Sequence, residues 1–374
     1  MYNILTLNKI AACGTDKFDS KYAVSDSFEN PTAVMVRSAS MHETEFSPET
    51  IAVARAGAGT NNIPVDKCAE KGIVVFNTPG ANANAVKELV ICGLFLASRK
   101  VTAACDWAKG LKGKGDEVGK LVEKGKSQFA GPEISGKTLG VIGMGAIGFK
   151  VAQAAEALGM KIIGYDPYIS EGAKAALSPD TVLVNDINEI FKLSDYITIH
   201  VPLNDATKNT VNKDTLALCK DGVRILNFAR GGLVNSDAII EALGTGKAAA
   251  YVVDFPSDEV IGVDGVIAIP HLGASTPESE DNCAMMAADE LIGYIEKGEI
   301  INSVNMPRMA LDAVKGTRIC VIHKADAADA VRTAIGTDVK NATRGDYGYT
   351  VADADADAEK ISAIDGVIKV RVIK

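Results

Sequence analysis

The sequence has few of the residues that build metal centres or disulfide frameworks. It contains only four histidines, and none of its seven cysteines belongs to a Cys-x-x-Cys pair. His-x-x-x-His and clustered Cys/His spacings are also absent, so we expect no dedicated metal site. Scattered cysteines are typical of reduced thiols, and we expect the protein to work in the cytoplasm.

The chain also lacks an excess of basic residues and any long uninterrupted apolar run. Its net charge of −9 argues against nucleic acid and anionic membranes as partners. The N-terminus does not have the basic-then-apolar layout of a signal peptide. The most apolar long stretch, residues 85–101, contains Lys87, Glu88 and Arg99, so we expect no membrane span.

What the 374 residues do contain is an alternation of short apolar runs with helical patterns, which is typical of an α/β fold with parallel sheets. The expected strands are 33–37, 51–55, 73–77, 138–142, 161–165, 181–185, 196–200, 223–228, 249–253 and 266–269. Long helices are expected over 83–99 and 276–297, and helix plus surface loop over 106–136. In the last part, we expect strands 318–323, 348–351 and 367–373, and helices 326–336 and 356–363.

The most specific pattern links two of these strands. Strand 138–142 runs into Gly143-Met-Gly145-Ala-Ile-Gly148, an Ala-rich helical pattern follows, and the next strand ends at Asp166. Gly143 allows a tight turn, Gly145 lets a pyrophosphate approach the backbone, and Gly148 lets helix and strand pack closely. The helix N-terminus offers free N–H groups to the phosphates. We predict a dinucleotide site, and Asp166 favours NAD over NADP because its carboxylate would repel a 2′-phosphate.

Three side chains capable of acid–base and anion chemistry follow strands of this half. They are Arg230, Glu259 and His271, and ligands of open parallel sheets bind at such strand ends. A neutral imidazole can take the hydroxyl proton of a 2-hydroxy acid as C2 loses hydride. A carboxylate beside it would fix its tautomer, and a guanidinium would hold the substrate carboxylate. Asp258, next to Glu259, is the alternative carboxylate.

Two further features have weaker patterns. His200 also ends an expected strand, and we interpret it as a wall of the cofactor pocket. Arg37 and Ser38 end a strand of the first part, and the glycine loop 56–61 follows the next strand. Free N–H groups beside an arginine can form an anion cradle; an ordinary strand-to-helix turn is the alternative interpretation.

Together these motifs resemble the D-isomer-specific 2-hydroxyacid dehydrogenases. The resemblance covers about residues 1–305 and extends through Val34-Met-Val-Arg-Ser, Ala54-Arg-Ala-Gly-Ala-Gly-Thr-Asn-Asn-Ile and Pro270-His-Leu-Gly-Ala-Ser. It is greatest for the branch that oxidises 3-phosphoglycerate to 3-phosphohydroxypyruvate at the start of serine biosynthesis. The alternatives are a sister enzyme acting on glyoxylate, hydroxypyruvate or lactate, and an NAD-sensing protein of the corepressor type.

The resemblance implies a domain plan. Two Rossmann-like parallel-sheet domains are expected, a substrate domain split between residues 1–88 and 276–305 and an NAD domain at 89–275 that drives dimer formation. A linker at 306–316 would lead to a small α+β domain at 317–374, which is similar to an ACT regulatory module. Its first strand leads into Lys-Ala-Asp-Ala-Ala-Asp, without the Asn, Pro and Gly of the usual effector loop.

The resemblance also implies roles for individual residues. Arg230, Glu259 and His271 match the catalytic triad, although Asp254-Phe-Pro-Ser-Asp-Glu259 departs from the usual Asp-Val-Phe-x-x-Glu. The implied substrate-binding residues are Arg37, Ser38, Ala58, Gly59 and Arg230. The implied cofactor-binding residues are Gly143, Met144, Gly145, Ala146, Ile147, Gly148, Asp166, Pro167, His200, Pro202, Ala229, Asp254, Gly273 and Ala274.

Overall fold

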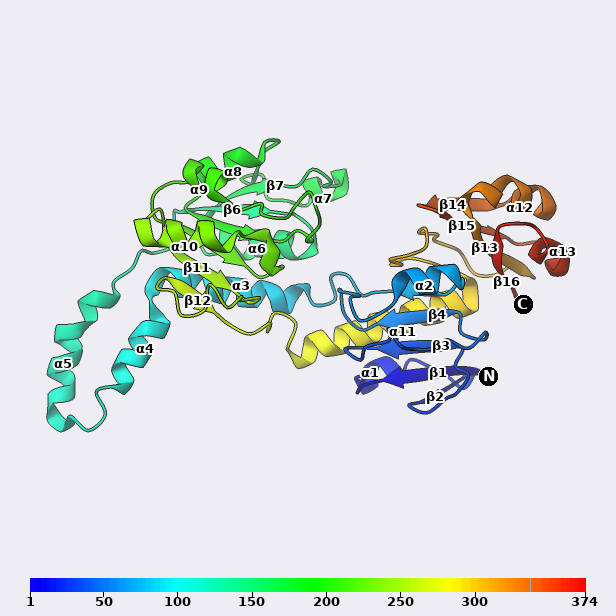
Figure 1. The fold of residues 1–374 in the computed structure, drawn as a ribbon, viewed down its shortest axis with the longest axis horizontal. Helices are drawn as coiled ribbons and strands as arrows, with labels where there is room; N and C mark the ends of the chain where they lie inside the picture. The colour runs from blue at the N-terminus through cyan, green and yellow to red at the C-terminus, as the bar shows by residue number, and fades with distance from the viewer. Residues whose placement is uncertain (337) are drawn as a thin grey trace. The chain divides into compact units, whose positions relative to one another are not determined.

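The computed structural model describes residues 1–336 and 338–374 and divides into two compact units (Figure 1). The first unit comprises Met1–Asn82 and Thr276–Lys374, and the second comprises Ala83–Ser275. The sequence analysis placed this boundary after residue 88. In the structure the whole of helix α3 (Ala83–Arg99) lies in the second unit, because it packs against α6, β10 and β11 there.

The first unit contains a parallel five-stranded sheet with the order β2-β1-β3-β4-β5. Its strands are β1 (Tyr2–Leu7), β2 (Tyr22–Ser25), β3 (Ala33–Val36), β4 (Ala52–Arg55) and β5 (Val74–Phe76). The helices in residues 1–82 and 276–297 of this unit are α1 (Ala12–Thr15), α2 (Val65–Glu70) and α11 (Pro277–Lys297). Figure 1 shows the long α11 lying along this sheet, which it contacts at β3 and β4.

Side-chain alternation gives this sheet two buried faces. In β3, Ala33 and Met35 belong to the core that α11 covers, whereas Val34 and Val36 belong to the core on the opposite face. This is the period of two that a strand imposes. Leu291 of α11 is fully buried in the first of these cores, and burial of one such side chain stabilises the fold by about 1.5–3 kcal/mol.

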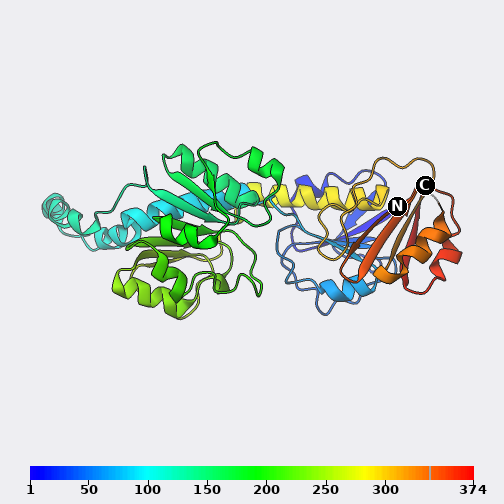
Figure 2. The ribbon, with the colours of Figure 1, turned by 90° about the horizontal axis from the view of Figure 1, so that it is seen from above.

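The second unit is built on a parallel seven-stranded sheet with the order β12-β11-β10-β9-β6-β7-β8. Its strands are β6 (Thr138–Ile142), β7 (Lys161–Tyr165), β8 (Val182–Leu183), β9 (Tyr196–Ile199), β10 (Val223–Asn227), β11 (Ala248–Val253) and β12 (Val266–Ala268). The strand order reverses between β6 and β9, so a ligand crevice is expected outside their carboxyl ends. Figure 2 shows helices on both faces of this sheet.

The helices of the second unit include a pair that carries no buried residue. Besides α3, they are α4 (Val101–Lys109), α5 (Val118–Gly125), α6 (Ala146–Ala157), α7 (Glu171–Ala175), α8 (Ile187–Leu193), α9 (Lys213–Leu218) and α10 (Ser236–Thr245), with short 3-10 turns at Gly115–Glu117, Lys126–Phe129 and Gly231–Leu233. Helices α4 and α5 form an arm that projects from the rest of this unit (Figure 1), and neither buries a side chain.

The C-terminal part adds an antiparallel four-stranded sheet with the order β14-β15-β13-β16. Its elements are β13 (Arg318–Lys324), a 3-10 turn (Ala325–Ala327), α12 (Ala328–Ile335), β14 (Lys340–Arg344), β15 (Tyr347–Ala352), α13 (Ala358–Ser362) and β16 (Val367–Ile373). This βαββαβ order is the ferredoxin-like arrangement. One sheet face packs on α12 and α13, and the other joins the core of the first unit.

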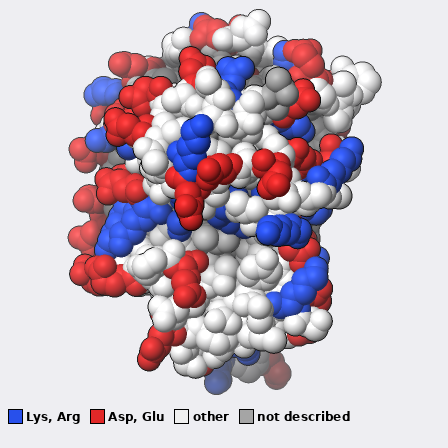
Figure 3. Space-filling model, turned by 90° about the vertical axis from the view of Figure 1, so that its right-hand side faces the viewer, with Lys and Arg blue, Asp and Glu red and all other residues white. Residues whose placement is uncertain are grey.

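Several polar contacts hold this small sheet on α11. Arg371 donates to the carbonyl oxygens of Tyr294 and Ile295 over 3.3 and 3.1 Å. Tyr349 Oη donates to the Gly298 carbonyl over 2.7 Å. The Ile295 and Gly298 carbonyls at the end of the helix thereby accept donors from the small sheet, and the Tyr294 carbonyl, which also accepts from the Gly298 N–H, accepts a second. On the face drawn in Figure 3, acidic and basic side chains are interspersed.

The predicted α/β class and its two parallel sheets are confirmed. Strands β1, β2 and β14 were not predicted. Strand β14 reads Lys-Asn-Ala-Thr-Arg and is mostly exposed at a sheet edge, so it has no apolar alternation to reveal it. No helix in residues 1–336 and 338–374 is both long and apolar enough to cross a membrane.

Candidate active site

The three glycines after β6 meet three different steric demands. Gly143 has φ +93°, and a Cβ there would lie 2.8 Å from the His200 carbonyl oxygen. A Cβ on Gly148 would lie 1.9 Å from the Gly143 carbonyl oxygen, whereas one on Gly145 would meet nothing within 4 Å. The loop therefore turns tightly, packs closely on its helix and leaves open space at Gly145, where α6 begins. This geometry fits a pyrophosphate.

Asp166, just after β7, is tied to this glycine loop. Its Oδ2 accepts a hydrogen bond from the Met144 N–H over 2.9 Å, and its Oδ1 accepts one from the Tyr168 N–H over 2.9 Å. The two bonds fix the carboxylate beside the loop, and Pro167 follows it on the exposed side. Asp166 thus lies beside the glycine loop, and its contact with an adenosine ribose stays a prediction.

Two side chains at this sheet edge have buried polar atoms without a partner in the described part of the chain. Asp254 follows β11 and is 1% exposed, yet neither carboxylate oxygen accepts a hydrogen bond within the described residues. Burial raises the pKa of Asp254 to about 6. His200 Nε2 lies 2.9 Å from Thr198 Oγ1, while its buried Nδ1 has no partner in the described part of the chain. Burial lowers the pKa of His200 to about 3, so it is neutral and unsuited to catalyse proton transfer near pH 7.

Unpartnered buried groups are costly and mark where a polar ligand belongs. A nicotinamide carboxamide has both a donor and an acceptor, so Asp254 and His200 suit a cofactor that reaches from the glycine loop across the sheet edge. Gly273 is buried against this acid, since a Cβ on it would lie 3.5 Å from Asp254 Oδ2. Ala274, the next residue, is half-buried.

The loop after β10 is shaped by Asn227. Its Nδ2 donates to the Arg230 carbonyl over 2.8 Å, and its Oδ1 accepts from the Ala229 N–H over 3.2 Å. The Arg230 side chain donates to the Ala229 carbonyl over 2.7 Å and is exposed. Pro202, after β9, accepts from Thr207 Oγ1 over 2.5 Å.

Phe255 connects two of the predicted catalytic residues. The guanidinium carbon of Arg230 lies 5.2 Å from the centroid of the Phe255 ring. The His271 ring centroid lies 4.1 Å from the same centroid, with the planes tilted by 41°. Side chains that follow β10 and β12 are therefore brought together on one aromatic ring that follows β11. Sequence reasoning missed Phe255, whose only signal was the departure from the Asp-Val-Phe pattern.

Glu259 and Asp258 are both exposed in the loop after β11. A hydrogen bond from the Ser257 side chain lowers the pKa of Glu259, so this carboxylate is ionised. Contact between Glu259 and His271 stays a prediction.

In the first unit, Arg37 follows β3 and pairs with α11. Its Nη2 lies 2.6 Å from Glu280 Oε1 in the first turn of that helix. The Ser38 N–H donates to Asn8 Oδ1 over 2.9 Å, so this amide is already occupied. In the described residues, by contrast, the loop N–H groups of Ala58 and Gly59 donate no hydrogen bond.

Other polar groups lie at this edge of the first sheet. Arg55, at the end of β4, donates from Nε to the Arg37 carbonyl over 3.1 Å. Asn62 donates to the Ala39 carbonyl over 2.8 Å, but its buried Oδ1 accepts nothing among the described residues, and the same holds for Thr78 Oγ1. Arg55 was not predicted, although it precedes the glycine loop directly.

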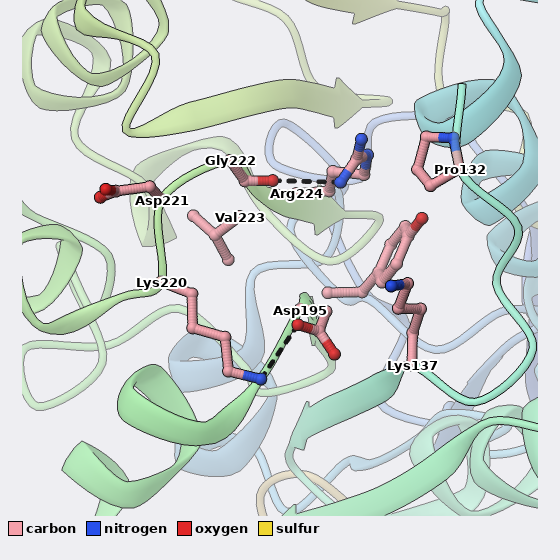
Figure 4. A pocket seen from close by; sticks show the side chains of 9 residues that line it. Pro132, Lys137, Asp195, Lys220, Asp221, Gly222, Val223 and Arg224 are labelled. Carbon is pink, nitrogen blue, oxygen red and sulfur yellow. Dashed lines mark hydrogen bonds and ion pairs between the residues drawn. The ribbon is translucent and has the colours of Figure 1, made fainter. Parts of the chain in front are cut away.

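A separate cavity of about 340 Å³ lies at the opposite edge of the second-unit sheet, where β9 and β10 begin (Figure 4). Within it, Lys220 pairs with Asp195 over 2.9 Å, and Arg224 donates to the Gly222 carbonyl over 3.1 Å. Ligands of parallel sheets bind at the carboxyl ends, and we assign this cavity no catalytic part. Among the described residues, no group of three or more His, Cys, Asp or Glu is placed to hold a metal ion.

Solved structures of known proteins share the overall fold of this chain. Among solved structures, the NAD⁺-bound 3-phosphoglycerate dehydrogenase of Entamoeba histolytica has a TM-score of 0.63 and 26% identity, covering 82% of this chain and 99% of that one. A glyoxylate reductase from Paecilomyes thermophila has a TM-score of 0.67 and 25% identity, covering 81% of this chain and 98% of that one.

Comparison of sequences finds the same kinds of dehydrogenase and reductase as comparison of structures. The D-3-phosphoglycerate dehydrogenase of Methanocaldococcus jannaschii is 40% identical over 264 residues, which cover 69% of this chain and 48% of that protein. The hydroxypyruvate reductase of Thermotoga maritima is 42% identical over 241 residues, 61% of this chain and 72% of that protein. The chain spans about half the length of the phosphoglycerate dehydrogenases it matches. Residues 95–273 match the NAD binding domain model of one family, and on these grounds the chain belongs to the D-isomer specific 2-hydroxyacid dehydrogenases.

Proposed function

We propose that the protein oxidises 3-phosphoglycerate to 3-phosphohydroxypyruvate with NAD. The observation that carries the proposal is the placement of Arg230 and His271 on the ring of Phe255, next in sequence to the unpartnered acid Asp254. A guanidinium, an imidazole and a cofactor site at one sheet edge are the parts that hydride transfer from a 2-hydroxy acid requires.

Each proposed site residue has a separate role in hydride transfer. When bound, NAD accepts the hydride that leaves C2 of the substrate. His271 takes the hydroxyl proton, so the C2–O bond becomes a carbonyl and the proton rests on the imidazole. Arg230 holds the substrate carboxylate and polarises the developing carbonyl. Glu259 is the carboxylate that would fix the tautomer of His271.

Arg37 is proposed to bind the distal phosphate. Support comes from its position at the carboxyl end of β3, close to Arg55, with the unoccupied amides of Ala58 and Gly59 in the next loop. Arginine and backbone N–H groups together bind phosphate well. The names of the phosphoglycerate dehydrogenase relatives support the same substrate.

Reduction of an unphosphorylated 2-oxo acid is the second candidate. The relative from Thermotoga maritima is named a hydroxypyruvate reductase. In this protein the Arg37–Glu280 ion pair already neutralises the arginine, which favours a substrate that brings no phosphate.

Initial rates with NADH and a panel of 2-oxo acids test the proposal. We expect 3-phosphohydroxypyruvate to have the highest kcat/KM, above hydroxypyruvate, glyoxylate and pyruvate. The Arg37→Ala variant should lose about 10–100-fold in kcat/KM for the phosphorylated acid and little for hydroxypyruvate. Equal losses on both acids would contradict a phosphate contact, and NADH binding without any turnover would favour the NAD-sensing alternative.

We further propose that the protein forms a dimer through the second unit. The supporting feature is the arm of α4 and α5, where Val101 is 43% and Val122 38% exposed. The rings of Trp107 and Phe129 also meet there, with centroids 5.5 Å apart and planes tilted by 54°. Exposed apolar side chains on a projecting arm are typical of an interface. Sedimentation equilibrium should show a dimer, and Val122→Glu should weaken it; a monomeric wild-type protein would contradict this proposal.

The C-terminal sheet, residues 317–374, is proposed to be an ACT-like regulatory module. Its βαββαβ order supports that assignment, and titration of the protein with free amino acids, serine first, followed by calorimetry would test it.

A further inference from the structure

We propose that Phe255 is a positioning residue that holds the guanidinium of Arg230 and the imidazole of His271 ready for catalysis. The inference rests on the proposed roles of those two residues and extends that function to a residue without reactive groups. Its basis is the pair of ring contacts, 5.2 Å to the Arg230 guanidinium carbon and 4.1 Å to the His271 ring centroid.

The local backbone explains why Phe255 points toward these groups. Asp254, the preceding residue, follows β11 and is buried. The chain bends at Asp254 and Phe255, directly after β11, and the Phe255 side chain leaves the core there. Pro256 follows and restricts the backbone there. The aromatic ring is consequently half-buried rather than part of the core.

The loop that carries Arg230 is fitted closely to Phe255. A Cβ on Gly231 would lie only 3.1 Å from the Phe255 carbonyl oxygen and 3.7 Å from its Cβ. Only a residue without a side chain allows this approach easily, and it places the preceding residue, Arg230, over the ring. The backbone of this loop is held in turn by Asn227, which donates to the Arg230 carbonyl over 2.8 Å.

Both groups are exposed, and contact with the ring adds to the restraint on their rotamers. The negative face of an aromatic ring attracts a guanidinium, and an imidazole stacks on it in either charge state. Catalysis depends on such positioning, since small displacements of a reacting group lower the rate strongly.

The other surroundings of Phe255 argue against a role in core packing alone. The ring borders a cavity of about 430 Å³, which Glu259, Ser257 and Asn235 also line. A side chain that faces a cavity contributes less to stability than one enclosed by the core.

Kinetics of three variants with NADH and 3-phosphohydroxypyruvate test the inference. We expect Phe255→Leu to lower kcat about tenfold while the Kd for NADH and the melting temperature stay near those of the wild type. Phe255→Tyr keeps the ring and should stay within about twofold of the wild-type kcat. Phe95→Leu, which removes an exposed ring elsewhere in the same unit, is the matched control and should leave kcat unchanged.

An NMR readout separates this role from the proposed function. The ring current of Phe255 should shift the imidazole proton resonances of His271, which are assignable because the protein has only four histidines. The resonances should move in Phe255→Leu and stay in Phe95→Leu. Wild-type kcat in Phe255→Leu, or an unchanged His271 resonance, would overturn the inference. If the wild-type protein turns over no 2-oxo acid, both the positioning role of Phe255 and the proposed function are wrong. A His271 resonance that still moves in Phe255→Leu would then show that the ring contact exists without the proposed catalysis.

Discussion

Arg37 and Glu280 form an ion pair of 2.6 Å within the first unit, although 243 residues separate them in the chain. The pair joins the loop after β3 to the first turn of α11, where an acidic side chain is also favoured by the helix dipole. Each side chain is 41% exposed. A phosphate that binds Arg37 must therefore compete with, or share, the Glu280 carboxylate.

Glu280→Gln should consequently improve binding of the phosphorylated substrate. Exposed pairs of this kind contribute about 0.2–1 kcal/mol, so we expect the KM for 3-phosphohydroxypyruvate to fall by up to about fivefold. The KM for hydroxypyruvate, which has no phosphate, should not change. Initial-rate kinetics on the two acids give the comparison, and a KM that rises for the phosphorylated acid would show that Glu280 assists binding.

Asp166 should determine the choice between NAD and NADP. Its carboxylate is fixed by the N–H groups of Met144 and Tyr168, and a 2′-phosphate there would cost about 1–3 kcal/mol. Wild-type kcat/KM should strongly favour NADH over NADPH, and Asp166→Ser should reduce that preference by about 10–100-fold. Equal use of both cofactors by the wild type would refute this role.

The glycine loop and the sheet that carries it were predictable because their signals are local. Three glycines, an Ala-rich helix and a terminal acid lie within one stretch of chain, and each glycine meets a separate steric requirement. The ends of β6, β7 and β16 agree with the sequence prediction.

The missed features depend on contacts that spacing does not encode. Glu280 is far from Arg37 in sequence. Phe255 is recognised only by its contacts with Arg230 and His271, which lie in the loops after β10 and β12. Nor did the pattern of residues 317–374 show that one face of their sheet is buried against α11. An apolar alternation predicts a buried face but not which element covers it.

Asp254 should make the stability of the cofactor-free protein depend on pH. Burial raises its pKa from 3.8 to about 6, so the folded state binds the proton more tightly than the unfolded chain does. The stabilisation is present below pH 4 and is lost as the pH rises through 6, amounting to about 3 kcal/mol at most. Asp254→Asn should remove this loss in urea unfolding experiments at pH 4 and pH 8.

The exposed Asp258→Asn is the control for that experiment, since its carboxylate is not buried. It should leave the pH dependence of the free energy of unfolding as in the wild type. Identical pH profiles for the Asp254 variant and the wild type would mean that the buried carboxyl is ionised at no cost.

Glu259, rather than Asp258, should support the catalytic imidazole. Glu259→Gln should move the pH optimum of hydroxy acid oxidation to lower values, because loss of a nearby carboxylate lowers the pKa of a histidine. Asp258→Asn should leave the profile in place. A shift in the Asp258 variant alone would reverse the assignment.

The most direct test of the account is the turnover of His271→Ala, measured together with its affinity for NADH. The proposed role in proton transfer predicts a fall in kcat of about 10²–10⁴-fold, with the Kd for NADH close to that of the wild type. A variant that keeps most of its turnover would contradict the account, because proton transfer would then belong to another group.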